Sequence, residues 1–252
     1  SSVASVDANI ADFANISFNN KFSSDGYGSI DRSPNDRSNE NYSQYNFVTS
    51  VNAGQLLPQK WGINIPLSYT FSEEVSKPKY DSFHNDLDLN NLIDISDNKD
   101  SIINQSSLIS TSKSFSLIGL SKNAQSDKEI KFYDIENLNF SHSYSENNYR
   151  DYELEFSERK SSQTSASYSY NFRDATFYPL KGLINSDSKN LAWLKEFNFN
   201  LIPSNISFST NINRRLCTQK FREINYGGVI SENQIPLPVL KQTNFLFDWR
   251  MA

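Results

Sequence analysis

Strict alternation of apolar and polar residues is the feature that most constrains this chain. It recurs in many short runs, of which Ile63–Phe71 is the clearest, with apolar side chains at the odd positions. Successive side chains of a β-strand point to opposite faces, so each run predicts a strand with one apolar and one polar face. The same alternation occupies Ala14–Phe18, Tyr45–Val51, Leu138–Ser145, Tyr152–Phe156, Thr164–Phe172, Phe197–Leu201, Ile206–Ile212 and Phe245–Met251.

The composition of the two faces is unusual. The polar positions are almost wholly Ser, Asn, Thr and Gln, and the apolar positions are rich in Phe and Tyr. In a soluble β-sandwich the apolar faces would pack on a second sheet, whereas in an outer-membrane barrel they would face lipid. The alternation is compatible with both. Runs of about ten residues favour the membrane barrel, because globular strands usually have about five or six residues.

Composition also excludes several classes of protein. The chain has 252 residues with a net charge of −5, one Cys and two His, so a disulfide framework, a zinc site and a nucleic-acid footprint are not expected. The chain contains no run of 18 apolar residues, so no transmembrane helix is predicted. No hydrolase, protease, nucleotide-binding or dinucleotide motif is present, so we predict a protein that is not an enzyme and has no cofactor.

Four local features could have a special role. The run Asp86–Asn90 resembles the start of a calcium loop, but Asn91 replaces the glycine such a loop needs, so a solvated acidic loop is preferred. His142 lies in phase with the apolar residues of its run, and Cys217 is interpreted as a single free thiol. Pro66 cannot donate a ladder hydrogen bond, so a bulge or a neighbouring strand that ends early is expected beside it.

The segments between the runs are polar and of unequal length. Long loops are predicted at about 23–42, 77–112, 173–196 and 225–242, and a short turn at 146–150. One short helix is predicted from Ser186 or Asp187 through Leu194, and a weaker one over Asp97–Ser110. We interpret residues 1–252 as a single region and as an internal piece of a longer protein.

The alternation assigns individual side chains to faces. Residues predicted to face lipid or a partner are Ile63, Ile65, Leu67, Tyr69, Phe71, Phe140, Tyr144, Tyr168, Tyr170 and Phe208. Residues predicted to face the lumen are Asn64, Ser68, Ser141, Ser143, Ser167, Ser169, Ser207 and Asn211. No catalytic, cofactor-binding or metal-binding residues are predicted.

Several ordered segments carry a family resemblance, and together they run from about Phe13 to Arg222. They are Asp31–Tyr45, Gly54–Tyr69, Ser72–Asp81, Asp134–Tyr152, Tyr178–Lys181 and Phe197–Arg214. In this order they resemble the SprA/Sov family of Bacteroidota outer-membrane proteins. The resemblance implies an all-β fold: a segment of a very large antiparallel transmembrane β-barrel, with long polar loops and one or two short helices.

The resemblance also implies a function. The family forms the protein-conducting channel of the type IX secretion system in the Gram-negative outer membrane, which passes folded cargo to the cell surface and serves gliding motility. The partners implied are outer-membrane lipid, a companion barrel that receives cargo, a periplasmic plug protein, accessory periplasmic proteins and the exported proteins. The family has no catalytic residues to carry over, and no nucleic acid is expected.

The residue pattern also suggests how such a channel would work, and it leaves other functions open. A wide barrel lined by Ser, Asn, Thr and Gln would give a hydrated, weakly charged wall that does not bind a passing protein. The alternatives are a fragment of a porin or of a TonB-linked transporter, and a soluble β-sandwich that acts as an adhesin or binding module.

Overall fold

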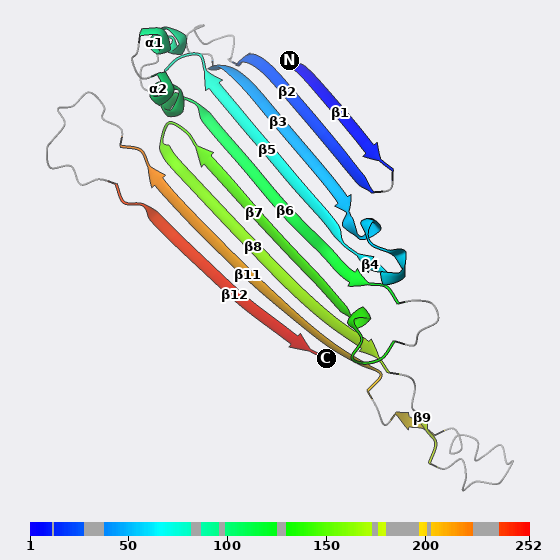
Figure 1. The fold of residues 1–252 in the computed structure, drawn as a ribbon. Helices are drawn as coiled ribbons and strands as arrows, with labels where there is room; N and C mark the ends of the chain where they lie inside the picture. Colours follow the sequence, from blue (N-terminus) through cyan, green and yellow to red (C-terminus); the bar gives the residue numbers. More distant parts are fainter. Residues whose placement is uncertain are drawn as a thin grey trace.

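One antiparallel sheet of ten strands dominates the computed structural model (Figure 1). The structure describes residues 1–11, 13–27, 38–81, 87–95, 99–124, 130–172, 176–179, 197–200, 203–223 and 237–252. Nine strands follow one another across the sheet in chain order: β1 (Ser2–Ile10), β2 (Ala14–Tyr27), β3 (Ser38–Asn52), β5 (Pro66–Pro78), β6 (Leu108–Lys122), β7 (Leu138–Arg150), β8 (Leu154–Asn171), β11 (Asn205–Phe221) and β12 (Leu240–Met251). The tenth strand, β4 (Ile63–Asn64), pairs with β6. A separate pair consists of β9 (Thr176–Phe177) and β10 (Phe199–Asn200).

The predicted all-β, antiparallel character is confirmed, and the strands are longer than the predicted runs. β8 has 18 residues and β11 has 17. Two long strands, β1 and β6, were not predicted at all, and neither was the two-residue strand β9. In β6 the polar half of the alternation is present as Ser at positions 110, 112, 114 and 116. Lys113 stands at one of the intervening positions, where the alternation would require an apolar residue.

Several predicted loops are shorter than expected because the strands extend into them. β2 continues to Tyr27 and β3 starts at Ser38, both within the predicted 23–42 loop, and β12 starts at Leu240 within the predicted 225–242 loop. The predicted turn at 146–150 is wrong, since β7 continues through Arg150. The predicted 173–196 loop falls largely outside the described residues, apart from β9 and its neighbours.

The actual turn between β7 and β8 is built around Asp151. Its Oδ1 accepts hydrogen bonds from the backbone N–H groups of Glu153 (2.8 Å) and Leu154 (2.6 Å), and its Oδ2 accepts one from the Tyr149 hydroxyl (2.9 Å). An aspartate that bonds the backbone two residues further along favours a turn there, and this local chemistry displaced the turn from its predicted position.

Two short helices lie between β5 and β6 at one end of the sheet (Figure 1). They are α1 (Leu89–Ile95) and α2 (Lys99–Ser106), so the predicted 77–112 loop contains ordered structure. The predicted helix over Asp97–Ser110 is partly confirmed by α2, which ends earlier because Leu108 already pairs in β6. The predicted helix through Leu194 lies outside the described residues.

The segment is fastened to the sheet through Asp81, whose carboxylate Oδ1 accepts a hydrogen bond from Ser106 Oγ at 2.9 Å. Both side chains are buried, as is Leu89 at the start of α1. The helices are therefore held at the end of β5 rather than projecting freely.

The break predicted at Pro66 is present. Ile65 separates β4 from β5, so Pro66 is the first residue of β5 and needs to donate no hydrogen bond into an uninterrupted ladder. On the neighbouring strand β6 the register shifts between Leu117 and Leu120, and Gly119 adopts φ +84°. Its N–H donates to Ser141 Oγ at 2.9 Å. The neighbouring strand therefore contains the kind of bulge expected beside the proline.

The sheet is open, so the barrel expected from the sequence is not closed within the described residues. Every neighbouring pair is antiparallel, and nine strands lie on the path from β1 to β12. An odd number of antiparallel strands makes the two edge strands run in the same direction, as Figure 1 shows. Joining β12 to β1 would therefore need a parallel seam, whereas bacterial single-chain barrels have even numbers of antiparallel strands.

This parity predicts that residues 1–252 do not form a closed barrel by themselves. We expect the isolated chain, refolded in detergent, to lack a compact, heat-modifiable monomer on unboiled gels. The reason is that open edges leave unpaired N–H and C=O groups, each costing several kcal/mol in an apolar medium. A detergent-stable, heat-modifiable monomer would contradict the prediction.

Candidate functional site: two unlike faces of one sheet

Cross-strand registers sort the side chains of the sheet onto two faces. Residues directly opposite each other on neighbouring strands share a face. One row of such partners crosses the sheet and includes Tyr69. We call the face of the sheet that carries this row the apolar face. The row consists of Ala8, Ile16, Thr49, Tyr69, Phe115, Tyr144, Ser162, Arg214 and Phe245.

The opposite side, which we call the polar face, carries hydroxyl and amide side chains. One row crosses it at Ser68, whose Oγ lies 2.6 Å from Ser116 Oγ on the next strand. The row consists of Ser50, Ser68, Ser116, Ser143, Gln163 and Asn213. Short polar side chains therefore line this face from β3 to β11.

The predicted residues fall into these two faces. The registers place Leu67, Tyr69, Phe71, Phe140, Tyr144, Tyr168, Tyr170 and Phe208 on the apolar face. They place Ser68, Ser141, Ser143, Ser167, Ser169, Ser207 and Asn211 on the polar face. Ile63 and Asn64 lie in β4, opposite Lys122 and Ser121, and Ile65 lies between strands. Which medium each face meets stays a prediction.

No layer of the described chain covers the apolar face. Its large side chains are open to the surroundings even on central strands, with Tyr69 at 37% exposure, Phe115 at 40% and Phe208 at 41%. The only buried apolar residues among those described are Ala14 and Leu89. Soluble monomers rarely expose apolar patches beyond a few hundred Å². This face therefore needs a cover that the described residues do not supply.

The apolar zone slants across the sheet. On the first strands it reaches the row of Phe71, which contains Val6, Phe18 and Phe47. On the last strands it is displaced toward the end of the sheet opposite α1 and α2, where Leu138, Tyr168, Phe208 and Met251 share a row. A flat apolar layer crosses tilted strands at successively shifted residues, so the slant is typical of tilted barrel strands.

Charged residues end the apolar zone on the central strands. In the row of Phe71, Lys113, Glu146 and Lys160 stand opposite one another on β6, β7 and β8. Within β8, Lys160 Nζ also lies 2.6 Å from Glu158 Oε1. Between β11 and β8, Lys220 Nζ lies 2.7 Å from Glu155 Oε2. Exposed ion pairs stabilise a fold little, so their relevance here is that they mark where the apolar zone stops.

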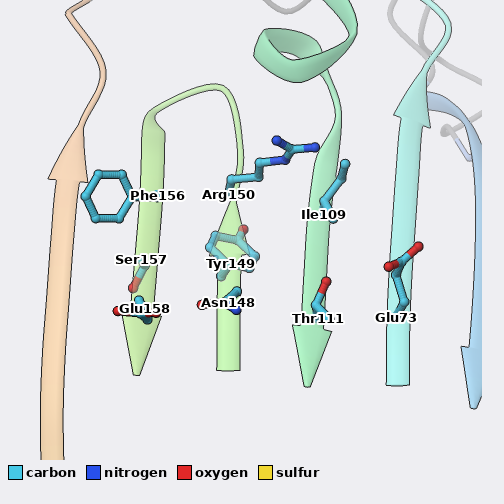
Figure 2. Close-up of a pocket in the computed structure, with 9 residues that line it drawn as sticks. All are labelled: Glu73, Ile109, Thr111, Asn148, Tyr149, Arg150, Phe156, Ser157 and Glu158. Atoms are coloured by element: carbon cyan, nitrogen blue, oxygen red, sulfur yellow. The ribbon is translucent and has the colours of Figure 1, made fainter. Parts of the chain in front are cut away.

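A shallow hollow of about 570 Å³ lies beyond this row (Figure 2). Figure 2 shows its lining contributed by four neighbouring strands, with Glu73 on β5, Thr111 on β6, Arg150 on β7 and Glu158 on β8. Its charged lining residues are Glu73, Arg150 and Glu158. It is part of the charged end of the sheet and not an enclosed binding pocket.

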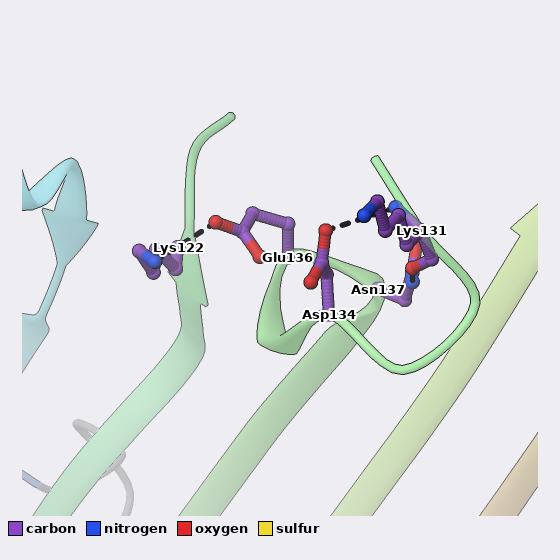
Figure 3. A network of polar contacts seen from close by, with 5 residues as sticks. All are labelled: Lys122, Lys131, Asp134, Glu136 and Asn137. Atoms are coloured by element: carbon purple, nitrogen blue, oxygen red, sulfur yellow. Dashed lines mark hydrogen bonds and ion pairs between the residues drawn. The ribbon is translucent and has the colours of Figure 1, made fainter. Parts of the chain in front are cut away.

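A group of polar contacts lies at the opposite end of the sheet, where β6 ends and β7 begins (Figure 3). The 3-10 helix η4 (Ile135–Asn137) presents Glu136, whose Oε1 lies 2.8 Å from Lys122 Nζ. Asp134 accepts a hydrogen bond from the backbone N–H of Lys131 at 2.9 Å, and Asn137 donates to the Lys131 carbonyl at 2.8 Å. The contacts hold residues 131–137 against the end of β6 and contain no feature typical of catalysis.

Asp88 and His142, two of the remaining sequence candidates, have ordinary hydrogen-bond partners. Asp88 Oδ1 accepts from the Asn90 N–H at 2.9 Å at the start of α1, while Asp86 and His84 lie outside the described residues. His142 Nδ1 lies 2.8 Å from Thr164 Oγ1. Cys217 is a half-exposed free thiol. In the described ranges, no three His, Cys, Asp or Glu side chains are grouped closely enough to hold a metal ion.

The charged row was missed by sequence reasoning, although a signal existed. The row consists of Lys113, Glu146 and Lys160, and each of them stands at a strand position whose side chain points to the apolar face. A charge at such a position indicates where a strand leaves its apolar surroundings, but the cross-strand alignment of three such charges requires the register.

Comparison with protein families identifies the first part of the chain. Residues 1–93 match the model of the SprA_N family, which is described as a motility related/secretion protein. The resemblance to the SprA/Sov family is thereby confirmed over this segment, and the match is not to an enzyme family. No curated protein matches the chain. None of the helices in the described segments is long and apolar enough to span a membrane.

The face assignment predicts alternating accessibility along β5. If lipid covers the apolar face, as the sequence predicts, spin labels at Leu67, Tyr69 and Phe71 should show the oxygen-favoured accessibility of a lipid environment. Labels at Ser68 and Thr70 should show water accessibility, because adjacent strand positions face opposite sides. Equal water accessibility at both sets would contradict the assignment.

Proposed function

We propose that this chain forms part of the wall of a large transmembrane β-barrel in the outer membrane of a Gram-negative bacterium, and that the barrel conducts folded proteins to the cell surface. The observation that carries the proposal is the uncovered, slanted apolar face backed by a face of small polar side chains. The match of residues 1–93 to a motility and secretion family supports the same function.

Lipid is the cover that best suits the apolar face. A β-sandwich would need a second layer of apolar side chains, and the described residues provide none. Lipid-facing barrel surfaces combine an apolar band with aromatic side chains near the interfaces, which matches the Phe and Tyr residues of this face. Closure of the sheet by further strands would pair the backbone groups that β1 and β12 leave open.

The strands also extend beyond the membrane. A tilted barrel strand needs about 9–11 residues to cross the bilayer, whereas β3 and β6 have 15 residues each. The charged row at Lys113, Glu146 and Lys160 then lies near the membrane surface. The strand ends that carry α1 and α2 project into water on that side.

The polar face becomes the inner wall of the channel. Hydroxyl and amide groups keep a wall hydrated, and on this face they outnumber the charged residues, such as Glu74 and Asp248. A passing protein would therefore meet mostly neutral groups. Selection of cargo then depends on loops and on partner proteins. The partners we propose are a companion barrel that receives cargo, a periplasmic plug protein and accessory periplasmic proteins, together with the exported cargo itself.

A matched pair of substitutions tests this function. Phe208→Arg places a charge on the apolar face of β11, and Ser209→Arg places the same charge on the adjacent residue of the polar face. We expect Phe208→Arg to destabilise the barrel by roughly 2–4 kcal/mol near the bilayer midplane, whereas Ser209→Arg leaves assembly nearly unchanged. The measurements are barrel abundance in the outer membrane and the amount of cargo at the cell surface.

For Phe208→Arg, export should fall in parallel with barrel abundance. If both variants assembled and exported cargo normally, β11 would not face lipid and the membrane-wall proposal would be wrong. If cargo export were unaffected when the barrel is lost, the chain would not form the route of export.

A further inference from the structure

Charged residues are a minority on the polar face, and two of them are neighbouring arginines. Arg159 on β8 stands opposite Cys217 on β11, and Arg215 on β11 stands opposite Ser161 on β8. The two arginines are therefore diagonal neighbours on adjacent strands, within reach of each other's long side chains. Both are exposed, and both line a hollow of about 340 Å³.

From β5 to β12, no acidic residue lies in the two cross-strand rows that contain these arginines. The row of Arg159 continues from β5 to β12 through Ser72, Ser112, Asn147, Cys217 and Gln242, and the row of Arg215 through Thr70, Ser114, Ser145, Ser161 and Asn244. None of these residues is acidic. By contrast, Arg250 on β12 lies 3.5 Å from Asp248 on the same face.

The remaining groups around the arginines can donate hydrogen bonds. Asn147 lies on β7, and Gln242 and Asn244 lie on β12, with their amide groups on the same face as both guanidinium groups. From β7 to β12 the donors span three strand spacings, or about 14 Å. This is longer than a single small anion, and it suits a stretch of polypeptide with several carboxylates.

We propose that Arg159 and Arg215 form a binding site for an acidic polypeptide segment on the polar face. Each guanidinium can hold one carboxylate through two parallel N–H···O bonds, and the neighbouring amides can bond the peptide backbone. The site depends on the geometry of the polar face and not on what covers the apolar face. If the proposed function holds, the site lies on the route of exported proteins and gives the otherwise passive wall one point of contact.

Cys217 provides the readout, since it lies between the two arginines and is the single cysteine of the chain. The experiment uses the full-length protein that contains this chain, purified with detergent in every buffer so that it does not depend on what covers the apolar face. The rate at which a maleimide labels Cys217 is followed by mass spectrometry of the peptide that carries it. A decapeptide of glutamate should slow labelling several-fold, and a decapeptide of glutamine should not.

The double variant Arg159→Gln/Arg215→Gln should lose this protection, whereas the matched control Arg250→Gln should keep it. Protection of the unsubstituted protein should also weaken as NaCl is raised, because salt screens exposed charges. This salt series decides the question even if the double variant does not assemble.

Three results would overturn the proposal. They are equal protection by the glutamine peptide, protection that survives in the double variant, and protection by inorganic phosphate that equals that of the glutamate peptide. The last result would indicate a site for small anions. None of these outcomes depends on the lipid assignment of the apolar face, so failure here is distinguishable from failure of the proposed channel.

Discussion

The need to cover one apolar face is the constraint on which the rest of the structure depends. Nine long strands place Phe, Tyr, Leu and Ile on the same side, and the described residues leave that side bare. Water is a poor environment for such a surface, and burial of apolar area contributes about 25 cal/mol per Å². A second protein layer or lipid must therefore complete the fold, and the slant of the apolar zone across the strands favours a flat layer of lipid.

The pairing register of the strands keeps the two faces separate, because a shift of one strand by one residue would move its apolar side chains to the polar face. The region of Pro66 shows how the chain tolerates an interruption without a slip. Ile65 breaks the strand, and the bulge at Gly119 adjusts the neighbouring strand. After both irregularities the Leu67 and Phe140 side chains remain on the apolar face. The polar face consequently stays continuous across the interruption.

Much of this architecture was predictable because period-2 alternation directly encodes a two-faced strand. The face residues of β5, β7, β8 and β11 follow from it. β6 was missed because Lys113 interrupts its apolar phase, and the β7–β8 turn was misplaced because the capping role of Asp151 is a local geometric effect. The pairing of Arg159 with Cys217, and hence the site beside it, depends on register between residues 58 positions apart, which alternation cannot supply.

The central claim is that lipid covers the apolar face, and photo-crosslinking tests it most directly. Benzoylphenylalanine replaces Tyr144, which lies on the apolar face of the central strand β7, and its neighbour Ser143 on the polar face serves as the control. After illumination of intact outer membranes, the account predicts adducts of phospholipid or lipopolysaccharide at position 144 and none at position 143. Protein adducts at position 144 in place of lipid would contradict it and would indicate a second protein layer.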